Sequence, residues 1–213
     1  MKTDDLVTML ATGSGGVEQN AMGRRYATAL GWGVFGATLL MAVLLGVRHD
    51  LGRATLQPMF WVKLGYVLCL AMASLFALSR LSRPGLSLRG VGPALAAPLL
   101  LIWTLAVIAL AGTNPTERAS LLFGRTWASC PFLIATLSVP VFVAVMWAMK
   151  GLAPTRLWLA GGAVGVASGA IGAVVYSLHC QEMGAPFLAT WYLLGVLIPT
   201  VIGTLLGPRL LRW

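Results

Sequence analysis

Six apolar runs, each about as long as a lipid bilayer is thick, constrain this chain more than any other feature of its sequence. The runs are separated by short stretches, which hold most of the charged residues. A helix needs roughly 20 apolar residues to cross about 30 Å of hydrocarbon. We place the runs at residues 26–47, 58–78, 91–112, 130–149, 157–178 and 186–207. The sequence therefore predicts an all-α integral membrane protein, a bundle of six transmembrane helices with membrane lipid around it.

The composition excludes a water-soluble surface. Hydrophobic residues make up 58% of the chain and charged residues only 10%, well below the quarter or so that is usual in soluble domains. No cleavable signal peptide is expected, because Met1 to Asp5 lead into a polar stretch and the first apolar run begins only after Arg25. The net charge of +9 is explained by its placement around the membrane, so no direct nucleic-acid partner is predicted.

The placement of lysine and arginine predicts the orientation. Six spans put both termini on one side of the membrane. That side would receive Lys2, Arg24, Arg25, Arg80, Arg83, Arg89, Lys150, Arg156, Arg209 and Arg212. The other side would receive only Arg48, Arg53, Arg118 and Arg125. Because short cytoplasmic loops retain basic residues during insertion, we expect an inner-membrane protein with both termini in the cytoplasm.

The first 25 residues form a predicted cytoplasmic segment ahead of a membrane domain at residues 26–213. The pattern of residues 3–12 predicts a short helix. Acidic residues would lie at its N-terminal end, where the helix dipole is positive, and apolar residues would share one face. The residues predicted to bind a partner are Asp4, Asp5, Leu6, Met9 and Leu10. A flexible joint, Ser14 to Gly16, follows. Binding to a protein and lying on lipid headgroups both fit this pattern, although anionic lipids would repel the two aspartates.

Two cysteines are predicted at the outer ends of the spans. Cys130 begins the fourth run and Cys180 follows the fifth, with His179 and Glu182 beside it. In an oxidising compartment such thiols form a disulfide, and as thiolates they bind a soft ion such as zinc or cadmium. The spacing is no zinc-finger pattern, so a plain disulfide or a hydrogen-bonded histidine explains the residues equally well. Cys69, inside the second span, is assigned no role.

Lys63 lies within the second span, about five residues from its outer end. Its side chain could snorkel to the interface. Alternatively it pairs with Glu182 or Asp50 and ties the second span to the cysteine region.

Motifs for enzymatic chemistry are missing from the sequence. It has no nucleotide-binding loop, no GxSxG, HExxH or CxxC, and no pair of carboxylates inside the spans. We therefore predict that the protein is not an enzyme and needs no obligatory cofactor. A small transporter stays open, with Thr38, Ser74, Thr104 and Thr136 as sparse lining candidates, and so does a membrane thiol oxidoreductase. The glycines at 161, 165 and 169 give one helix face for close packing, within the chain or in a homodimer.

Several short stretches from end to end of the chain resemble one known family, the NrsF family. They are Met1 to Leu6, Phe60 to Lys63, Cys130, His179 to Glu182, Pro186-Phe187, Trp191-Tyr192, Gly195 and Gly207 to Trp213. The resemblance implies a six-span anti-sigma factor that sequesters an extracytoplasmic-function sigma factor at the inner membrane. It also implies that Cys130 and Cys180 respond to heavy metals or oxidants, and that residues 3–12 contact the sigma factor.

Overall fold

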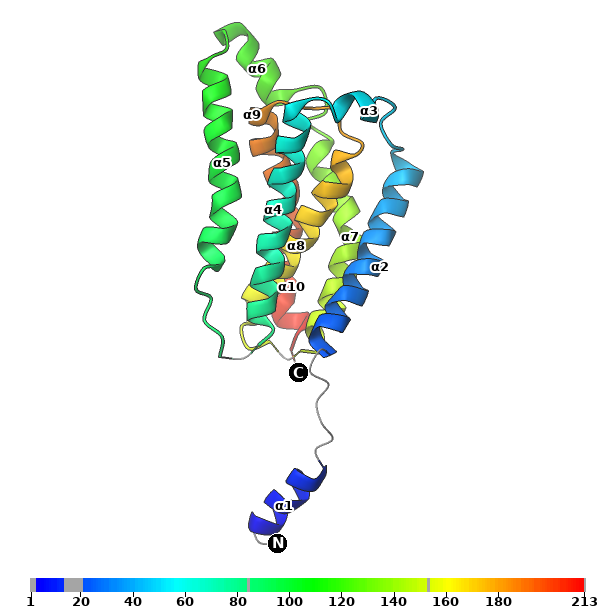
Figure 1. Ribbon diagram of the computed structural model, residues 1–213, viewed down its shortest axis with the longest axis vertical. Coiled ribbons are helices and arrows are strands. Elements are labelled where there is room, and N and C mark those ends of the chain that lie inside the picture. The colour runs from blue at the N-terminus through cyan, green and yellow to red at the C-terminus, as the bar shows by residue number, and fades with distance from the viewer. Residues whose placement is uncertain (1–2, 14–20, 84, 153, 213) are drawn as a thin grey trace.

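A computed structural model describes residues 3–13, 21–83, 85–152 and 154–212. In this described part every regular element is a helix, and no strand is present (Figure 1). The elements are α1 Thr3–Gly13, α2 Ala21–Leu44, α3 Leu51–Ala54, α4 Pro58–Leu81, α5 Val91–Ala111, α6 Pro115–Phe123, α7 Cys130–Lys150, α8 Leu157–Ser177, α9 Ala185–Phe187, the π-helical turn η1 Leu188–Tyr192, and α10 Leu193–Leu210.

The six predicted spans are confirmed as six helices long and apolar enough to cross a membrane. They are α2, α4, α5, α7, α8 and the continuous helix formed by α9, η1 and α10. The largest difference is at the start of α2, which begins at Ala21 and so includes Arg24 and Arg25. The aliphatic stems of arginine can lie along a helix while their charged ends reach the interface, so a helix continues past the apolar run.

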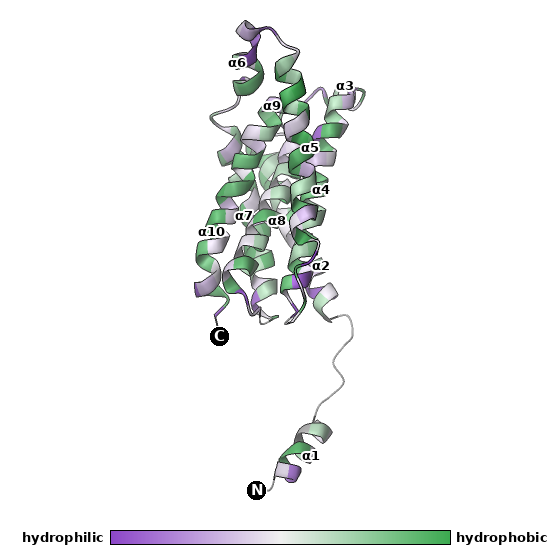
Figure 2. Cartoon of the chain, turned by 90° about the vertical axis from the view of Figure 1, so that its left-hand side faces the viewer, coloured by the Kyte–Doolittle hydropathy of each residue, from purple (hydrophilic) through white to green (hydrophobic). Residues whose placement is uncertain are grey.

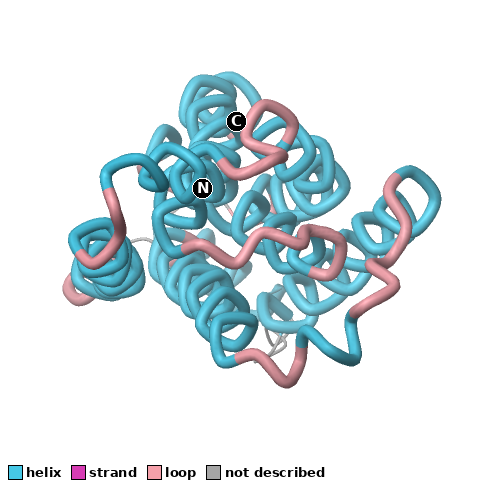
Figure 3. The backbone as a smooth tube through the Cα atoms, turned by 90° about the horizontal axis from the view of Figure 1, so that it is seen from above, coloured by secondary structure: helices cyan, strands magenta, loops and turns pink. Residues whose placement is uncertain are grey.

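The long helices run side by side (Figures 1 and 3), and α8 lies among them (Figure 1). α8 is the most buried of the six, and it packs against α10, α7 and α4. α5 is the least buried and lies at the edge, against α4 and α9. Apolar residues cover the sides of the bundle, whereas hydrophilic residues gather near its ends (Figure 2). This is the pattern expected when lipid surrounds the helices.

The two ends of the bundle differ in what they carry. We call the end with α3, α6 and α9 the upper end, as it is drawn in Figure 1, and the end with the C-terminus the lower end. α7 starts at the upper end with Cys130 and finishes at the lower end with Lys150.

The glycine face of α8 packs inside the chain. A Cβ atom on Gly161 would lie 2.0 Å from the carbonyl oxygen of Gly203, and one on Gly165 would lie 2.3 Å from that of Pro199. Such approaches are possible only because the glycines of α8 place no side chain between the two helix backbones. The open choice between internal packing and a dimer is therefore settled for this face, because α10 covers it.

Substitution of Gly165 by alanine should destabilise the bundle by about 1–3 kcal/mol, the usual cost of overpacking. The new methyl group would meet backbone atoms, including the Cα of Thr200 at 2.4 Å, which cannot rotate away. Gly31→Ala is the matched control, since its Cβ would have no atom within 4 Å. Thermal unfolding of the purified variants in detergent measures the difference. Equal unfolding temperatures for both variants would contradict the tight α8–α10 contact.

Candidate functional site

Two free, buried thiols lie together at the upper end of the bundle. Cys130 is the first residue of α7, and Cys180 lies in the loop at residues 178–184 that follows α8. The two residues are 0% and 3% exposed and form no disulfide with each other. Both cysteines belong to one buried cluster with Tyr176 and Tyr192, whose ring centroids are 5.8 Å apart, and the two thiols lie near each other and near the hydroxyl groups of both tyrosines. The fold therefore brings the predicted cysteine pair into one buried cluster.

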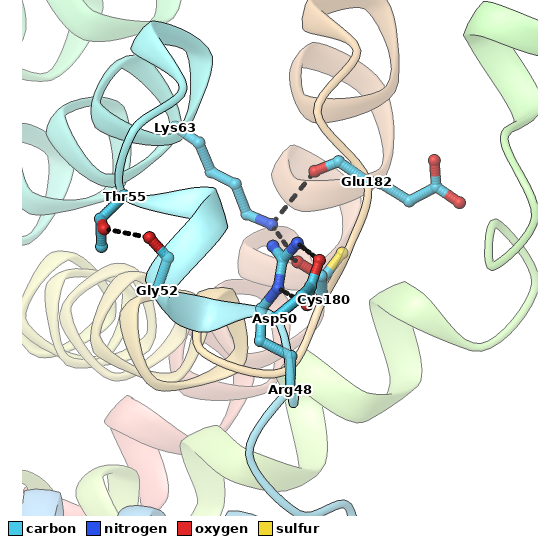
Figure 4. A network of polar contacts seen from close by, with 7 residues as sticks. All are labelled: Arg48, Asp50, Gly52, Thr55, Lys63, Cys180 and Glu182. Atoms are coloured by element: carbon cyan, nitrogen blue, oxygen red, sulfur yellow. Dashed lines mark hydrogen bonds and ion pairs between the residues drawn. The ribbon is translucent and has the colours of Figure 1, made fainter.

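Lys63 of α4 holds the loop that carries Cys180 (Figure 4). Its ammonium group donates to the carbonyl oxygen of Cys180 at 2.8 Å and to that of Glu182 at 3.2 Å. The same nitrogen lies 5.3 Å from the ring centroid of Tyr192, a cation–π distance. Lys63 is 0% exposed, so the alternative that it snorkels to the interface is wrong.

The predicted contact between Lys63 and the cysteine region is present, but its partner atoms differ from the prediction. Lys63 bonds the backbone carbonyl of Glu182 and not its carboxylate. The other predicted partner, Asp50, is paired with Arg48. A carbonyl is enough to satisfy an ammonium donor, and sequence pattern cannot show where backbone carbonyls point.

Arg48 is the second cation on this loop. Its guanidinium group donates to both carboxylate oxygens of Asp50, each at 2.7 Å, and to the carbonyl oxygen of Cys180 at 3.3 Å. The hydrogen bond with Arg48 lowers the pKa of Asp50 to about 2, and the same contact raises the pKa of Arg48. The stability gained from a carboxyl with a depressed pKa is lost only as the pH falls towards that value. The pair is therefore intact throughout the neutral range.

The side chains of His179 and Glu182 hold neighbouring loops. The Nδ1 atom of His179 is hydrogen-bonded to the carbonyl oxygen of Gly46 at 2.9 Å. The carboxylate of Glu182 accepts from the backbone N–H of Arg125 at 2.8 Å. In the described part of the chain, no group of three or more His, Cys, Asp or Glu side chains is placed to hold a metal ion. The metal interpretation therefore depends on the two thiols.

A cavity of about 690 Å³ borders Cys180. Its wall includes Arg48, His49, Arg125, Tyr176, His179 and Cys180. The cavity therefore places solvent-accessible space next to the residue that carries one of the two buried thiols.

Tyr192 is a member of this cluster that sequence reasoning missed. It is fully buried and ends the π-helical turn η1, which rotates the following helix relative to a regular α-helix. Among the residues that the structure describes, none is placed to hydrogen-bond its hydroxyl group. Single π-helical turns have no clear sequence signature, so only the structure could place this ring beside Lys63 and the thiols.

A second contact cluster that the sequence did not predict lies at the lower end, where α2 begins. The guanidinium group of Arg25 lies 4.7 Å from the ring centroid of Trp147 and donates to its carbonyl oxygen at 3.3 Å. The hydroxyl groups of Tyr26 and Ser82 are 2.6 Å apart, and that of Tyr26 also donates to the sulfur of Met149 at 3.4 Å. We call these five residues the lower clamp. It joins the start of α2 to the ends of α7 and α4.

The element α1, Thr3–Gly13, covers the residues for which the sequence predicts an N-terminal helix, and both aspartates lie in its first turn. Leu6, Val7 and Met9 are 42%, 59% and 66% exposed. Thr8 lies on the opposite face, and its hydroxyl donates to the helix backbone. The side chain of Leu10 and the predicted joint at residues 14–16 lie outside the described residues. α1 therefore presents apolar side chains that nothing described in this chain covers.

The four hydroxyl residues named as transporter candidates do not form a path. Each donates to a carbonyl of its own helix, and the residues are Thr38, Ser74, Thr104 and Thr136. They lie on four helices, with Thr104 and Thr136 exposed and Ser74 buried. Nothing in their arrangement favours transport.

Comparison with known proteins gives consistent matches along the chain. The family model described as "Negative regulator of sigma F" matches residues 10–213. The "Probable anti-sigma-F factor NrsF" of Azospira oryzae is 60% identical over 213 residues, and the match covers the whole of both chains. The "Anti-sigma-F factor NrsF" of Caulobacter vibrioides is 44% identical over 215 residues, again over the whole of both chains. No solved structure matches.

Proposed function

Because the chain belongs to the NrsF family of negative regulators of sigma F, we propose that it is a membrane-bound anti-sigma factor. It holds a sigma factor of the extracytoplasmic-function class at the bacterial inner membrane and so keeps it from RNA polymerase. When heavy metals or oxidants act at Cys130 and Cys180, the sigma factor is released. The relatives' names support the anti-sigma role, and the sigma class and the stimulus are our proposal.

We place the lower end in the cytoplasm and the upper end outside it. The basic residues support this orientation. Nine described ones belong to the lower end, namely Arg24, Arg25, Arg80, Arg83, Arg89, Lys150, Arg156, Arg209 and Arg212, and five to the upper end, namely Arg48, Arg53, Lys63, Arg118 and Arg125. Two of those five, Arg48 and Lys63, are buried in contacts with the Cys180 loop. Because basic residues are retained on the cytoplasmic side, this orientation is the favoured one. In it α1 can contact a cytoplasmic sigma factor.

The observation that carries the proposal is the uncovered apolar face of α1. A helix of 11 residues is marginal in water on its own, and exposed Leu6, Val7 and Met9 gain from burial against a partner. A sigma factor that covers this face would be withdrawn from RNA polymerase by mass action. An amphipathic helix in a groove is a common mode of such recognition.

The stimulus acts at the buried cluster that contains the thiols of Cys130 and Cys180. Binding of a soft ion would replace two thiol protons by two metal–sulfur bonds. Oxidation would join the sulfurs in a disulfide, with two protons and two electrons passing to the oxidant. Either event ties the start of α7 to the loop that follows α8, and the buried tyrosines and Lys63 must adjust around the new bond.

We propose that α7 carries the change to the lower end. The helix begins at Cys130 and ends next to the lower clamp, where Trp147 and Met149 hold the start of α2. α2 is the element that follows α1 along the chain. A differential affinity of a few kcal/mol between two arrangements of these helices would release most of the sigma factor.

Co-purification tests this proposal. The full chain, tagged at its C-terminus and extracted in mild detergent, should retain a sigma factor that mass spectrometry identifies. Addition of cadmium or of an oxidant should lower the recovered amount. Absence of any sigma factor from unstimulated cells that contain one of the matching class would overturn the proposed function.

Lys63→Met should lower the stability of the upper end and change the response to the stimulus. The substitution removes the 2.8 Å donor of the buried carbonyl of Cys180 and the donor of the half-buried carbonyl of Glu182, and an unsatisfied buried acceptor costs about 1–3 kcal/mol. Arg53→Met is the matched control, because Arg53 carries the same charge on exposed α3 and should affect neither property. Thermal unfolding and a dose–response curve from a transcriptional reporter are the measurements. If both properties stay unchanged in Lys63→Met, the residue has no part in the site.

A further inference from the structure

A basic cavity of about 280 Å³ lies at the lower end, away from the sulfur cluster. It is lined by Arg80 and Arg83 at the end of α4, by Arg156 at the start of α8, and by Ser87 and Thr155. The described residues of its wall include no acidic side chain. Such a cavity is complementary to an anion.

The guanidinium group of Arg80 lies 5.0 Å from the ring centroid of Phe76, whereas the other polar side chains of this cavity have no partner among the described residues. Neither the guanidinium groups of Arg83 and Arg156 nor the hydroxyl groups of Ser87 and Thr155 form a hydrogen bond or ion pair with the residues described. The 21-residue helix α8 begins here, and its N-terminal N–H groups have no side-chain cap. Guanidinium groups, hydroxyl groups and free N–H groups at a helix start are the donors that proteins use to bind phosphate.

An apolar cavity of about 270 Å³ adjoins the basic one on its bundle side. Leu81 and Leu88 line both, so the two cavities share a wall. The apolar cavity is bounded by α4, α5, α8 and α10, and Trp158, whose ring is exposed, lies at its rim. A tryptophan at this level is typical of the membrane interface. The combined space has a polar, positively charged head and an apolar tail.

We propose that these two cavities form one binding site for an anionic phospholipid of the leaflet at the lower end. The phosphate group lies between Arg83 and Arg156, and an acyl chain enters the apolar cavity past Leu81 and Leu88. A free phosphate ion would leave the apolar part unused. An acidic protein segment would have to pass the lipid headgroups and enter the hydrocarbon layer to fill the apolar cavity.

Occupancy of the site would stabilise the lower end. The arginines at 80 and 83 flank Ser82, whose hydroxyl group meets Tyr26 in the lower clamp. A lipid held between α4 and α8 therefore fixes the position of the helix end to which α2 is attached.

Native mass spectrometry of the purified full chain tests the site. The protein is exchanged into micelles doped with phosphatidylglycerol or with phosphatidylcholine, and retained lipid is counted. The wild type should retain phosphatidylglycerol in preference. Arg83→Gln with Arg156→Gln should lower its retention about tenfold or more, since charge-assisted hydrogen bonds are lost.

The matched control is Arg89→Gln with Arg209→Gln, two exposed arginines at the same end that do not line the cavity. This variant has the same net charge as the test variant and should retain lipid as the wild type does. Equal loss in both variants would mean that the charge of the lower end attracts lipid without a site. Retention without preference for phosphatidylglycerol, or its displacement by inorganic phosphate alone, would equally overturn the proposal.

Discussion

Leu6→Gln combined with Met9→Gln is expected to leave the genes controlled by the bound sigma factor switched on without any stimulus. Both side chains are exposed on the apolar face of α1, and glutamine keeps the helix propensity while it removes the apolar surface. Burial of two such side chains is worth about 3 kcal/mol or more. Their loss weakens binding about a hundredfold. A transcriptional reporter and the sigma content of the membrane fraction measure the effect.

The control for this variant uses the other face of the same helix. Thr8→Gln with Thr12→Gln changes as many residues of α1, but at positions whose hydroxyl groups bond the helix backbone. Repression should persist in this variant. Deletion of residues 2–12 should match the apolar-face variant. Continued repression after the deletion would remove α1 from the mechanism and leave it as a helix on the lipid surface.

Cys130→Ser combined with Cys180→Ser is expected to abolish induction by cadmium and by oxidants while repression remains intact. Serine is close to cysteine in size, so the buried cluster should keep its packing. Its oxygen neither forms a disulfide nor binds a soft ion as a thiolate does. Because the two sulfurs act as a unit, each single variant should lose as much induction as the double variant. The reporter response across a range of stimulus concentrations gives the measurement.

Cys69→Ser provides the matched control, since Cys69 is a free cysteine on the exposed side of α4. Induction should be normal in this variant. A mobility shift between oxidised and reduced protein separates a disulfide from a metal complex. An unaltered dose–response curve in the double variant would exclude the cysteine pair as the sensor.

The membrane architecture was predictable from sequence because the thickness of the hydrocarbon fixes the length of each apolar run. The runs and the helices agree to within a few residues, except at the start of α2. Arg24 and Arg25 lie just before the apolar run but inside the helix. The hydropathy pattern therefore places the start of this helix too late. The cysteine pair was also predictable, because six antiparallel spans bring the start of the fourth and the end of the fifth to the same end.

The contacts around the thiols were less predictable, because they depend on backbone direction. The carbonyl groups that Lys63 and Arg48 bond lie in a loop whose path follows from tertiary packing. The π-helical turn that ends at Tyr192 rotates one ring into the cluster without a sequence signal. Likewise, spaced glycines predict close helix packing but do not predict which helix is the partner. The structure identifies α10 as the partner of the glycine face of α8.

Labelling of introduced cysteines in intact cells tests the central claim most directly, namely that α1 and the thiol cluster face opposite sides of the membrane. The native cysteines are first replaced by serine, and Thr8→Cys in α1 or Glu117→Cys in α6 is added, both at exposed positions. A membrane-impermeant maleimide, admitted through the outer membrane, should label the variant at 117 at once. The variant at 8 should react only after the inner membrane is opened. Labelling of both variants in intact cells, or of the variant at 8 alone, would contradict the proposed mechanism.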